Sequence, residues 1–237
     1  MTKYVEVEHL QSLLAHIIHT ITDATFVLAT QLQHLLNQDL TATQDLKILL
    51  SAPYRQQVQH TIQNILNNYE HCNGAGFASH VASHSQNGDY WILEWWFKDE
   101  SRIEQAHLEL DQGTQQRLDF RTFDWFHQAS ASDQTYVHGP YVDYICNTAY
   151  TITAAHPIYV ETQFIGVAVV DILVATLEKR LIQTIKQIGC PVIITNQSDR
   201  VIISSLAKVR VGSIFKGNGQ EIKIDQSEKH PFKIYVL

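Results

Sequence analysis

Residues 4–37 carry an apolar pattern that constrains the chain to begin with a long helix. Apolar side chains that recur every three or four residues lie on one face of a helix. Two interpretations stay open: this row packs along its own domain, or it pairs with a second copy of the chain in a homodimer. The row consists of Leu10, Leu14, Ile17, Ile21, Ala24, Leu28 and Leu35.

The rest of the chain predicts shorter helices and then mostly strands. Two helices are expected at 41–51 and 54–69, with Pro53 suited to a first helical turn. Residues 72–80 predict a turn that leads into a strand, and the polar segment 99–118 predicts a helix or an excursion from the sheet. The other expected elements are helices at 121–130 and 172–188, strands at 87–97, 141–153, 157–162, 164–171 and 232–237, and a strand–turn–strand at 191–205.

This order of elements predicts an α+β protein with a long N-terminal helix, a central antiparallel sheet and a smaller C-terminal sheet. We expect an N-terminal helical region at 1–70, a larger module at 71–188 and a smaller module at 189–237. With 237 residues, of which 45% are hydrophobic and 17% charged, the chain is long and apolar enough to form a globular core.

Composition excludes several classes of protein. The net charge of −7 and the lack of a basic stripe argue against a nucleic-acid partner. Cys72, Cys146 and Cys190 are far apart and form no CxxC pair, so we expect neither a disulfide framework nor a zinc site, and no cofactor. The N-terminus lacks a signal-peptide pattern, and no stretch of ~18 uncharged apolar residues indicates a membrane span. We therefore expect a cytoplasmic protein.

Two aspartates stand in β-like sequences. Strand alternation places Tyr141, Asp143 and Ile145 on one face, and Asp171 ends the apolar run "IGVAVVD". An ionised carboxylate in such a strand is costly unless it faces water or has a partner. For Asp143 the alternative is a solvent-facing position, and for Asp171 it is a helix N-cap. Otherwise the two acids indicate a site for a cation.

Aromatic residues accompany these acids. Trp125 and Phe126 stand on the predicted short helix, and alternation within "YWILEWW" puts Tyr90, Glu94 and Trp96 on one strand face. Trp91 and Trp95 lie on the other face. Aromatic rings and carboxylates together suit an ammonium group, through cation–π contacts and charge-assisted hydrogen bonds. The alternative is a tryptophan-rich core, which we expect for at least one of Trp91 and Trp95.

The run "RTFDWFHQAS…YVHGPYVDYICNTAYTITAAHPIYVETQFIGVAVVDI" resembles the ligand-binding module of double Cache sensor domains, also called PDC domains. The shared motifs are a Trp-Phe/Tyr pair on a short helix, a "GPY-x-D" strand, a hairpin that starts with proline and ends in Gly-Val, and a terminal Asp. The resemblance extends from the long helix to the C-terminus. It implies two PAS-like modules carried by a long N-terminal helix, with the ligand in the first module.

The resemblance also implies residue roles in binding an amino acid. Asp171, Asp143 and Tyr141 would hold an ammonium group, and Trp125 and Phe126 would wall it. The arginine that binds the ligand carboxylate in this family, two residues before the Trp, does not carry over. Phe123 stands there instead, and the nearest arginine, Arg121, stands four residues before Trp125.

The missing arginine favours an amine over an amino acid, because a ligand carboxylate would meet uncompensated negative charge. The sequence thus predicts a sensor for a biogenic, poly- or quaternary amine, with an amino-acid sensor as the alternative. Glu94, if it faces the same site, would bind a second ammonium group. The family's members are mostly extracytoplasmic parts of anchored receptors, so a free-standing domain would signal through a dimer or a separate protein partner.

Two other classes of function compete with the sensor. An enzyme would need a site, and His80 and His84 have the i, i+4 spacing of metal ligands but no accompanying HExxH motif. Asp143 and Asp171 would suit a hydrolase only at a separation that the sequence does not fix. The other class is an interaction protein that binds through its long helix and has no ligand. We expect the sensor, with no catalytic activity and no metal.

Overall fold

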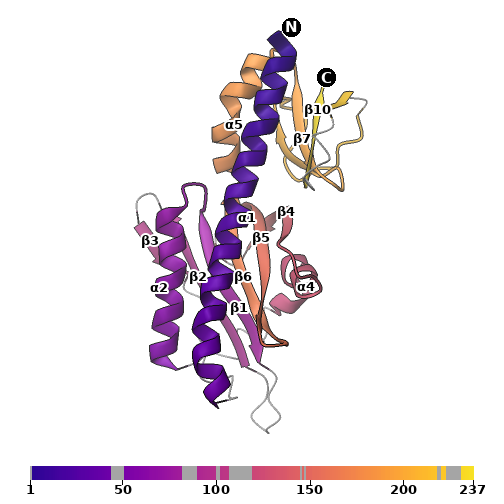
Figure 1. The fold of residues 1–237 in the computed structure, drawn as a ribbon. Coiled ribbons are helices and arrows are strands. Elements are labelled where there is room, and N and C mark those ends of the chain that lie inside the picture. The colour runs from indigo at the N-terminus through magenta and orange to yellow at the C-terminus, as the bar shows by residue number, and fades with distance from the viewer. Residues whose placement is uncertain are drawn as a thin grey trace. The chain divides into compact units, whose positions relative to one another are not determined.

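The computed structural model describes residues 2–43, 51–81, 90–99, 102–106, 119–144, 146, 148–217, 220–222 and 231–237. The chain begins with the long helix α1, Thr2–Thr43, as predicted (Figure 1). Six of the seven residues in the predicted apolar row are buried inside the chain, and Leu35 is half-buried. This row therefore packs within the protein, and pairing with a second copy stays a prediction that would have to use other residues of α1.

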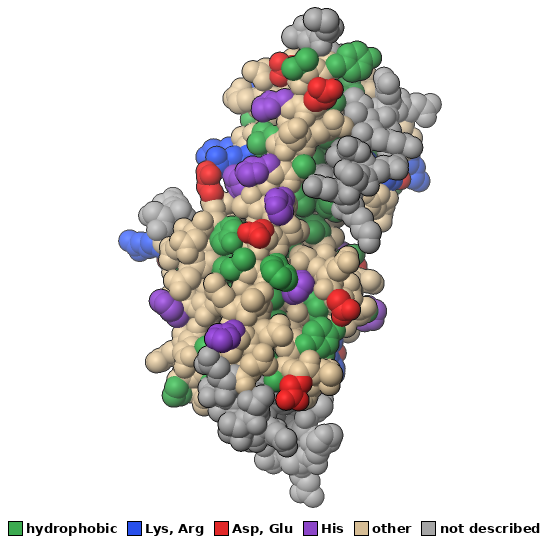
Figure 2. Space-filling model, viewed as in Figure 1, with side chains coloured by type: hydrophobic (Ala, Val, Ile, Leu, Met, Phe, Trp, Pro, Cys, Tyr) green, Lys and Arg blue, Asp and Glu red, His purple; other side chains and the backbone are tan. Residues whose placement is uncertain are grey.

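The exposed side of α1 is mixed in character. Its exposed apolar residues are the neighbours Tyr4 and Val5 near the N-terminus and Phe26, far from them along the helix. Figure 2, drawn from the same side as Figure 1, shows purple histidine side chains and separate green apolar side chains on this face. The exposed histidines of α1 are His9, His16, His19 and His34.

One property of α1 corrects the expectation that no segment is apolar enough to cross a membrane. Over Tyr4–Asn37 the described helix reaches a mean hydropathy of 1.4, which meets a length and composition criterion for a span. Of that apolar window, 44% is buried inside the protein, and the core helix of a soluble protein or a signal sequence meets the same criterion. The hydropathy of α1 is therefore weak evidence for a membrane span.

Helix α2, Ala52–Asn68, lies beside α1 and has Pro53 in its first turn, as predicted. The two helices are joined by a 2.6 Å hydrogen bond that the Tyr54 hydroxyl donates to the carbonyl of Leu35. Of the predicted helix 41–51, residues 41–43 continue α1 and 44–50 lie outside the described residues.

A six-stranded sheet follows, with the strand order β3-β2-β1-β6-β5-β4. Its register is antiparallel between β1 and β2, between β1 and β6, and between β2 and β3. The polar segment 99–118 contributes the strand β3 instead of the expected helix or excursion, and 107–118 lie outside the described residues. The strands are β1 Gly74–Val81, β2 Tyr90–Asp99, β3 Arg102–Gln105, β4 Tyr136–Asp143, β5 Ala149–Val160 and β6 Gln163–Leu173.

The predicted continuous strand 141–153 is wrong, because β4 ends at Asp143 and β5 begins only at Ala149. A turn separates them: the Asp143 carboxylate accepts a 3.2 Å hydrogen bond from the backbone N–H of Cys146. Thr148 has a positive φ of 54°, which no regular strand contains. The expected break between 157–162 and the preceding strand is absent, since β5 runs through Pro157.

The predicted short helix 121–130 is divided into two pieces. A 3₁₀ turn, η2, covers Phe120–Thr122, and the helix α4 covers Asp124–Ser130. Between them Phe123 is extended, with φ −79° and ψ 136°. Arg121 and Trp125 therefore do not share one helix.

The C-terminal part contains the helix α5, Val174–Ile188, and a second antiparallel sheet in the order β8-β7-β10-β9. Helix α5 ends at Gly189, whose φ of 73° is the left-handed conformation that closes many helices. Both the helix and the smaller C-terminal sheet were predicted. The strands are β7 Val192–Asn196, β8 Val201–Ser204, β9 Gln220–Ile222 and β10 Phe232–Val236.

The chain divides into two compact units that combine segments distant in the sequence. We call Ile21–His138 with Thr153–Asp171 the central unit. Met1–Thr20, Gly139–Ile152 and Ile172–Leu237 form the terminal unit. The three consecutive regions expected from the sequence, with boundaries after residues 70 and 188, stay a prediction.

Candidate functional site

The two faces of the central sheet carry different chemistry. Residues directly opposite each other in an antiparallel pair point to the same face. Gly74 is opposite Asp171 on β6, and Gly76 is opposite Trp95 on β2. Asp171, Gly74, Gly76, Trp95 and Trp91 therefore share one face, which we call the Asp171 face. Glu94 and Trp96 point to the other face, which we call the Glu94 face.

Helix α2 covers the Glu94 face. Arg55 forms an ion pair with Glu94 through its Nε atom, and Gln59 donates a 3.1 Å hydrogen bond to the same carboxylate. Gln105 of β3 donates another at 3.1 Å. With 2% exposure, Glu94 is a buried carboxylate that its own chain neutralises and that holds α2 against the sheet.

The sequence predicts that Glu94 binds a second ammonium group only if it faces the same site as Asp171. The two carboxylates lie on opposite faces of the sheet, so this condition is not met. Trp96 shares the Glu94 face, so it does not stand beside Asp171 either. Tyr90 is the first residue of β2 and pairs with Val81; its side chain lies outside the described residues. We do not include these three residues in the candidate site.

Asp171 is a strand residue in the interior of the protein. Its side chain is 1% exposed, and its Oδ1 atom accepts a 2.6 Å hydrogen bond from the Thr153 hydroxyl. Its carbonyl accepts a 2.8 Å hydrogen bond from the backbone N–H of Asn73. The N-cap alternative is wrong, because β6 continues to Leu173, which is the N-cap of α5. The burial of Asp171 thus needs another explanation.

Trp95 lies across two glycines on the Asp171 face. A Cβ atom at Gly76 would overlap the six-membered ring of this indole, so only glycine permits the close packing there. A Cβ atom at Gly74 would stand 3.3 Å from Trp95 Nε1 and 3.5 Å from Asp171 Oδ2. The polar edge of the indole and the Asp171 carboxylate therefore approach the same point above Gly74.

An aromatic cluster extends the Asp171 face. The rings of Trp91 and Phe120 meet edge to face with centroids 5.1 Å apart. Phe120 contacts Phe126 at 5.2 Å and stacks with Trp125 at 6.3 Å. Trp125 and Phe126 are each 5% exposed, and Trp91 and Trp95 each 4%. The structure thus brings Trp125 and Phe126 together with Trp91, and both Trp91 and Trp95 belong to the core, as expected for at least one of them.

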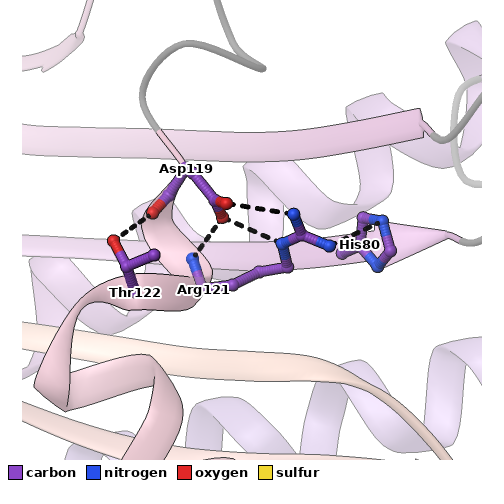
Figure 3. A network of polar contacts seen from close by, with 4 residues as sticks. All are labelled: His80, Asp119, Arg121 and Thr122. Carbon is purple, nitrogen blue, oxygen red and sulfur yellow. Dashed lines mark hydrogen bonds and ion pairs between the residues drawn. The ribbon is translucent and has the colours of Figure 1, made fainter.

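Arg121 is held in a local network at this cluster (Figure 3). Its Nε and Nη2 atoms donate hydrogen bonds of 2.8 and 3.0 Å to the two carboxylate oxygens of Asp119. Its guanidinium carbon lies 4.3 Å from the centroid of the Trp91 ring, and Nη1 lies 3.4 Å from His80 Nε2. These hydrogen bonds from Arg121 hold the pKa of Asp119 below its usual value. The guanidinium charge is therefore compensated by a carboxylate of the same chain.

The other two predicted ligands belong to the terminal unit. Tyr141 is a half-buried residue of β4, and Asp143 ends that strand. Asp143 is 6% exposed, so the alternative of a solvent-facing carboxylate is wrong. Because β4 stops at Asp143, the expected alternation of Tyr141, Asp143 and Ile145 does not continue, and Ile145 lies outside the described residues.

The described residues offer little support for catalysis or metal binding at this site. Burial raises the pKa of the Cys72 thiol to about 12; the charge of Lys98 lowers it and that of Asp171 raises it further. This thiol is therefore not an activated nucleophile. Within the described ranges, no group of three or more His, Cys, Asp or Glu side chains is arranged to hold a metal ion. His84, half of the predicted histidine pair, lies outside those ranges.

Two residues of this geometry, Trp95 and Gly74, were absent from the predicted site. The sequence contains a signal for them, since the glycines of "NGAGF" fall inside β1, and glycine within a strand often marks the close approach of another group. Taken alone, this segment predicts only a turn leading into a strand. Which aromatic ring would occupy the space over the glycines was not visible, because the β1–β2 register was unknown.

Comparison with known proteins gives the following relationships. The sequence pattern described as "Methyl-accepting chemotaxis protein-like, first PDC sensor domain" matches residues 58–179. No curated protein sequence matches this chain. A structure named methyl-accepting chemotaxis protein X is similar with a TM-score of 0.69 and 16% identity, over 99% of this chain and 95% of that one.

Two further structures are ligand-binding domains. That of the Campylobacter jejuni chemoreceptor Tlp3 in complex with L-valine has a TM-score of 0.53 and 18% identity, over 99% of this chain and 94% of that one. The other is the ligand-binding domain of the Pseudomonas aeruginosa PAO1 amino-acid chemoreceptor PctC in complex with GABA. It has a TM-score of 0.51 and 14% identity, over 91% of this chain and 97% of that one. At these identities the similarity concerns the fold, and it confirms the predicted α+β architecture with its long N-terminal helix.

Proposed function

Because this chain belongs to the family of methyl-accepting chemotaxis protein-like first PDC sensor domains, we propose that it senses a small molecule carrying an ammonium group. Ligand sensing is the role of the family. The amine, and the residues that bind it, are our proposal. Asp171 accepts hydrogen bonds from the ammonium group. The role of Trp125 and Phe126 in walling the ligand stays a prediction, because their cluster surrounds Trp91, which pairs with His80 six residues, roughly 20 Å, along β1 from the glycine opposite Asp171.

One observation carries this proposal: Asp171 is a carboxylate at 1% exposure on a sheet face rich in tryptophan and phenylalanine. Placing an ionised carboxylate among such groups is costly, and a bound cation offsets that cost through a charge-assisted hydrogen bond. The Thr153 hydroxyl satisfies Oδ1 and orients the carboxylate. Oδ2 is the oxygen nearer to the point above Gly74 that Trp95 also approaches.

The Arg121–Asp119 pair supports an amine over an amino acid. A ligand carboxylate would have to displace the two hydrogen bonds that Arg121 already makes to Asp119. The displaced Asp119 would then be left beside the ligand's negative charge, which is unfavourable. An amine makes no such demand on Arg121.

An amino-acid sensor is the second candidate. The observation in its favour is that the similar domains of Tlp3 and PctC are described in complex with L-valine and GABA. In that case Arg121 would have to leave Asp119 and move from Trp91, which pairs with His80, along the sheet toward Asp171, which pairs with Gly74. The ligand roles that the sequence predicts for Asp143 and Tyr141 stay predictions. We propose no catalytic activity, so a bound ligand should be recovered chemically unchanged.

Signal output is proposed to use a dimer or a separate protein partner, with the cytoplasm as the predicted location. If ligand binding changes the association of two chains, affinity and association are thermodynamically linked. Light scattering with and without the ligand tests the dimer directly. A mass that stays at one chain under both conditions leaves a separate partner as the proposed output.

A thermal-shift comparison of matched pairs tests the ligand class. Each pair contains an amino acid and the amine left by its decarboxylation: L-valine with isobutylamine, and GABA with propylamine. At about 100 times the dissociation constant, a ligand of the native state stabilises it by about 2.7 kcal/mol. We expect the amines to raise the melting temperature and their amino acids not to do so.

The same comparison on Asp171→Asn separates specific from non-specific stabilisation. This variant keeps the shape of the side chain and removes its charge, so the shift produced by amines should disappear. If the amino acids stabilise the wild type and the amines do not, the second candidate function replaces the first. If amines stabilise the variant as much as the wild type, Asp171 is not the ammonium site.

A further inference from the structure

Trp95 has a buried polar atom whose role the proposed binding mode does not explain. Its side chain is 4% exposed, and no described residue accepts a hydrogen bond from its Nε1–H group. Buried polar groups without a partner are rare in proteins, and each needs an explanation such as a bound molecule. The indole N–H is a donor only, so it requires an acceptor.

The position of this N–H group points to the ligand site. A Cβ atom at Gly74 would stand 3.3 Å from Nε1 and 3.5 Å from Asp171 Oδ2, so donor and acceptor approach one point from two strands. Both belong to the Asp171 face of the central unit. Gly74 contributes by its lack of a side chain, since any larger residue would bring a methyl group against both polar atoms.

A simple alkylamine satisfies only half of this arrangement. Its ammonium group donates hydrogen bonds to Asp171, but it has no acceptor for the Trp95 N–H. A ligand carboxylate would supply the acceptor, yet it would place a second negative charge close to the Asp171 carboxylate. A neutral oxygen close to the ammonium group satisfies both atoms without that repulsion.

We propose that Trp95 Nε1–H donates a hydrogen bond to a neutral oxygen of the ligand, so that this domain selects amines with an adjacent hydroxyl, the class of 1,2-amino alcohols. This inference rests on the proposed amine-sensing function and refines it. Asp171 accepts from the ammonium group, and the hydroxyl oxygen accepts from Trp95. Trp95 is thus a specificity-determining residue, while Asp171 provides most of the affinity.

A comparison of 2-aminoethanol with propylamine tests the hydroxyl, because the two have the same length and differ by a hydroxyl in place of a methyl group. Titration calorimetry on the full chain should show that wild type binds 2-aminoethanol about two- to tenfold more tightly, the range of one net hydrogen bond. Trp95→Phe keeps a ring and removes the donor, so it should abolish the preference for 2-aminoethanol over propylamine.

Trp96→Phe is the matched control. The Nε1 atom of Trp96 is also buried without a partner among the described residues, but it stands on the Glu94 face. The same chemical change there should leave the preference for 2-aminoethanol intact. In wild type, the indole ¹H–¹⁵N resonance of Trp95 should move on addition of 2-aminoethanol and much less with propylamine. This readout holds even if Trp95→Phe fails to fold.

The outcomes distinguish a failure of the role proposed for Trp95 from a failure of the proposed amine-sensing function. If both amines bind wild type equally, or if Trp95→Phe keeps the preference, the role of Trp95 is overturned and the amine-sensing function stands. If Trp96→Phe abolishes the preference as Trp95→Phe does, the effect is not specific to the Asp171 face and the inference fails. If neither amine binds wild type, the proposed function fails, and the inference fails with it.

Discussion

The two faces of the central sheet each bury a carboxylate, but they treat it differently. Glu94 receives an ion pair from Arg55 and hydrogen bonds from Gln59 and Gln105, all of which are supplied by the chain itself. Asp171 receives a hydroxyl hydrogen bond from Thr153 and lies on a face of tryptophan and phenylalanine rings. The comparison teaches that burial of an acid alone does not mark a ligand site. The groups around the acid, an arginine and two amides at Glu94 and a hydroxyl among aromatic side chains at Asp171, distinguish the two positions.

The largest expected effect is a loss of stability when the buried acid of the Glu94 face is removed. Glu94→Ala removes one partner of a buried ion pair and leaves Arg55 and two amides without their acceptor. Breaking such a pair costs about 3–5 kcal/mol of unfolding free energy. Because Arg55 is partly exposed, we expect a loss at the lower end, about 3 kcal/mol. Urea denaturation should show this loss, while the remaining folded protein still binds amines. A loss below about 1 kcal/mol would contradict the structural role of Glu94.

The second prediction concerns the packing of the Asp171 face. Gly76→Ala places a methyl group into the Trp95 ring and should destabilise the protein by about 1–3 kcal/mol through overpacking. Gly74→Ala is the matched comparison. Its methyl group would meet Trp95 Nε1 at 3.3 Å, so it should cost less stability but weaken ligand binding more. Equal effects of the two variants on stability and binding would contradict the geometry above Gly74.

A smaller effect is expected on ligand selectivity. It depends on whether the Arg121 guanidinium can bind the carboxylate of an amino-acid ligand. Asp119→Asn removes the carboxylate that holds the guanidinium and leaves Arg121 available to a ligand carboxylate. We expect the affinity for amino acids to rise about fivefold relative to their amines, a value typical of one charge-assisted hydrogen bond at a partly exposed site. Titration calorimetry with L-valine and isobutylamine measures it. An unchanged ratio would mean that Arg121 does not reach the ligand.

The smallest effect is a pH dependence of the Asp119–Arg121 pair. The folded protein holds the pKa of Asp119 below the ordinary 3.8, so the pair stabilises the folded state fully above that pH. Its contribution is lost as the pH falls through the lower folded value. The side chains are partly exposed, so wild type should exceed Asp119→Asn by less than about 1 kcal/mol at neutral pH. Urea denaturation across acid pH checks this: a difference that persists below the folded pKa would contradict it.

The comparison of the two faces also shows how far the sequence predicts such a site. Alternation within β2 correctly separated Glu94 and Trp96 from Trp91 and Trp95, because side-chain period is a local property. It did not reveal which group shares a face with Asp171. That depends on the pairing of β1 with both β2 and β6, and such register is set by contacts far apart in the sequence. Two predicted ligand residues, Glu94 and Trp96, therefore lie on the face opposite Asp171.

Local breaks were the other feature that the sequence did not reveal. The apolar row of α1 predicted a long helix correctly, since its periodicity continues over many turns. The extended Phe123, which separates Arg121 from α4, and the turn that ends β4 at Asp143 interrupt otherwise regular patterns over one to five residues. Tertiary packing and side-chain hydrogen bonds determine such interruptions, and residue propensities carry little information about them.

The central claim, that Asp171 is a ligand-binding carboxylate and Glu94 a structural one, is tested most directly by titrating isobutylamine into three proteins by calorimetry. These are wild type, Asp171→Asn and Glu94→Gln, each confirmed to be folded by circular dichroism. Both variants replace a buried acid by its amide, but on opposite faces of one sheet. The account predicts equal affinity in wild type and Glu94→Gln and a loss of about 10- to 100-fold in Asp171→Asn, the range of one charge-assisted hydrogen bond. Binding that survives in Asp171→Asn and is lost in Glu94→Gln would contradict it.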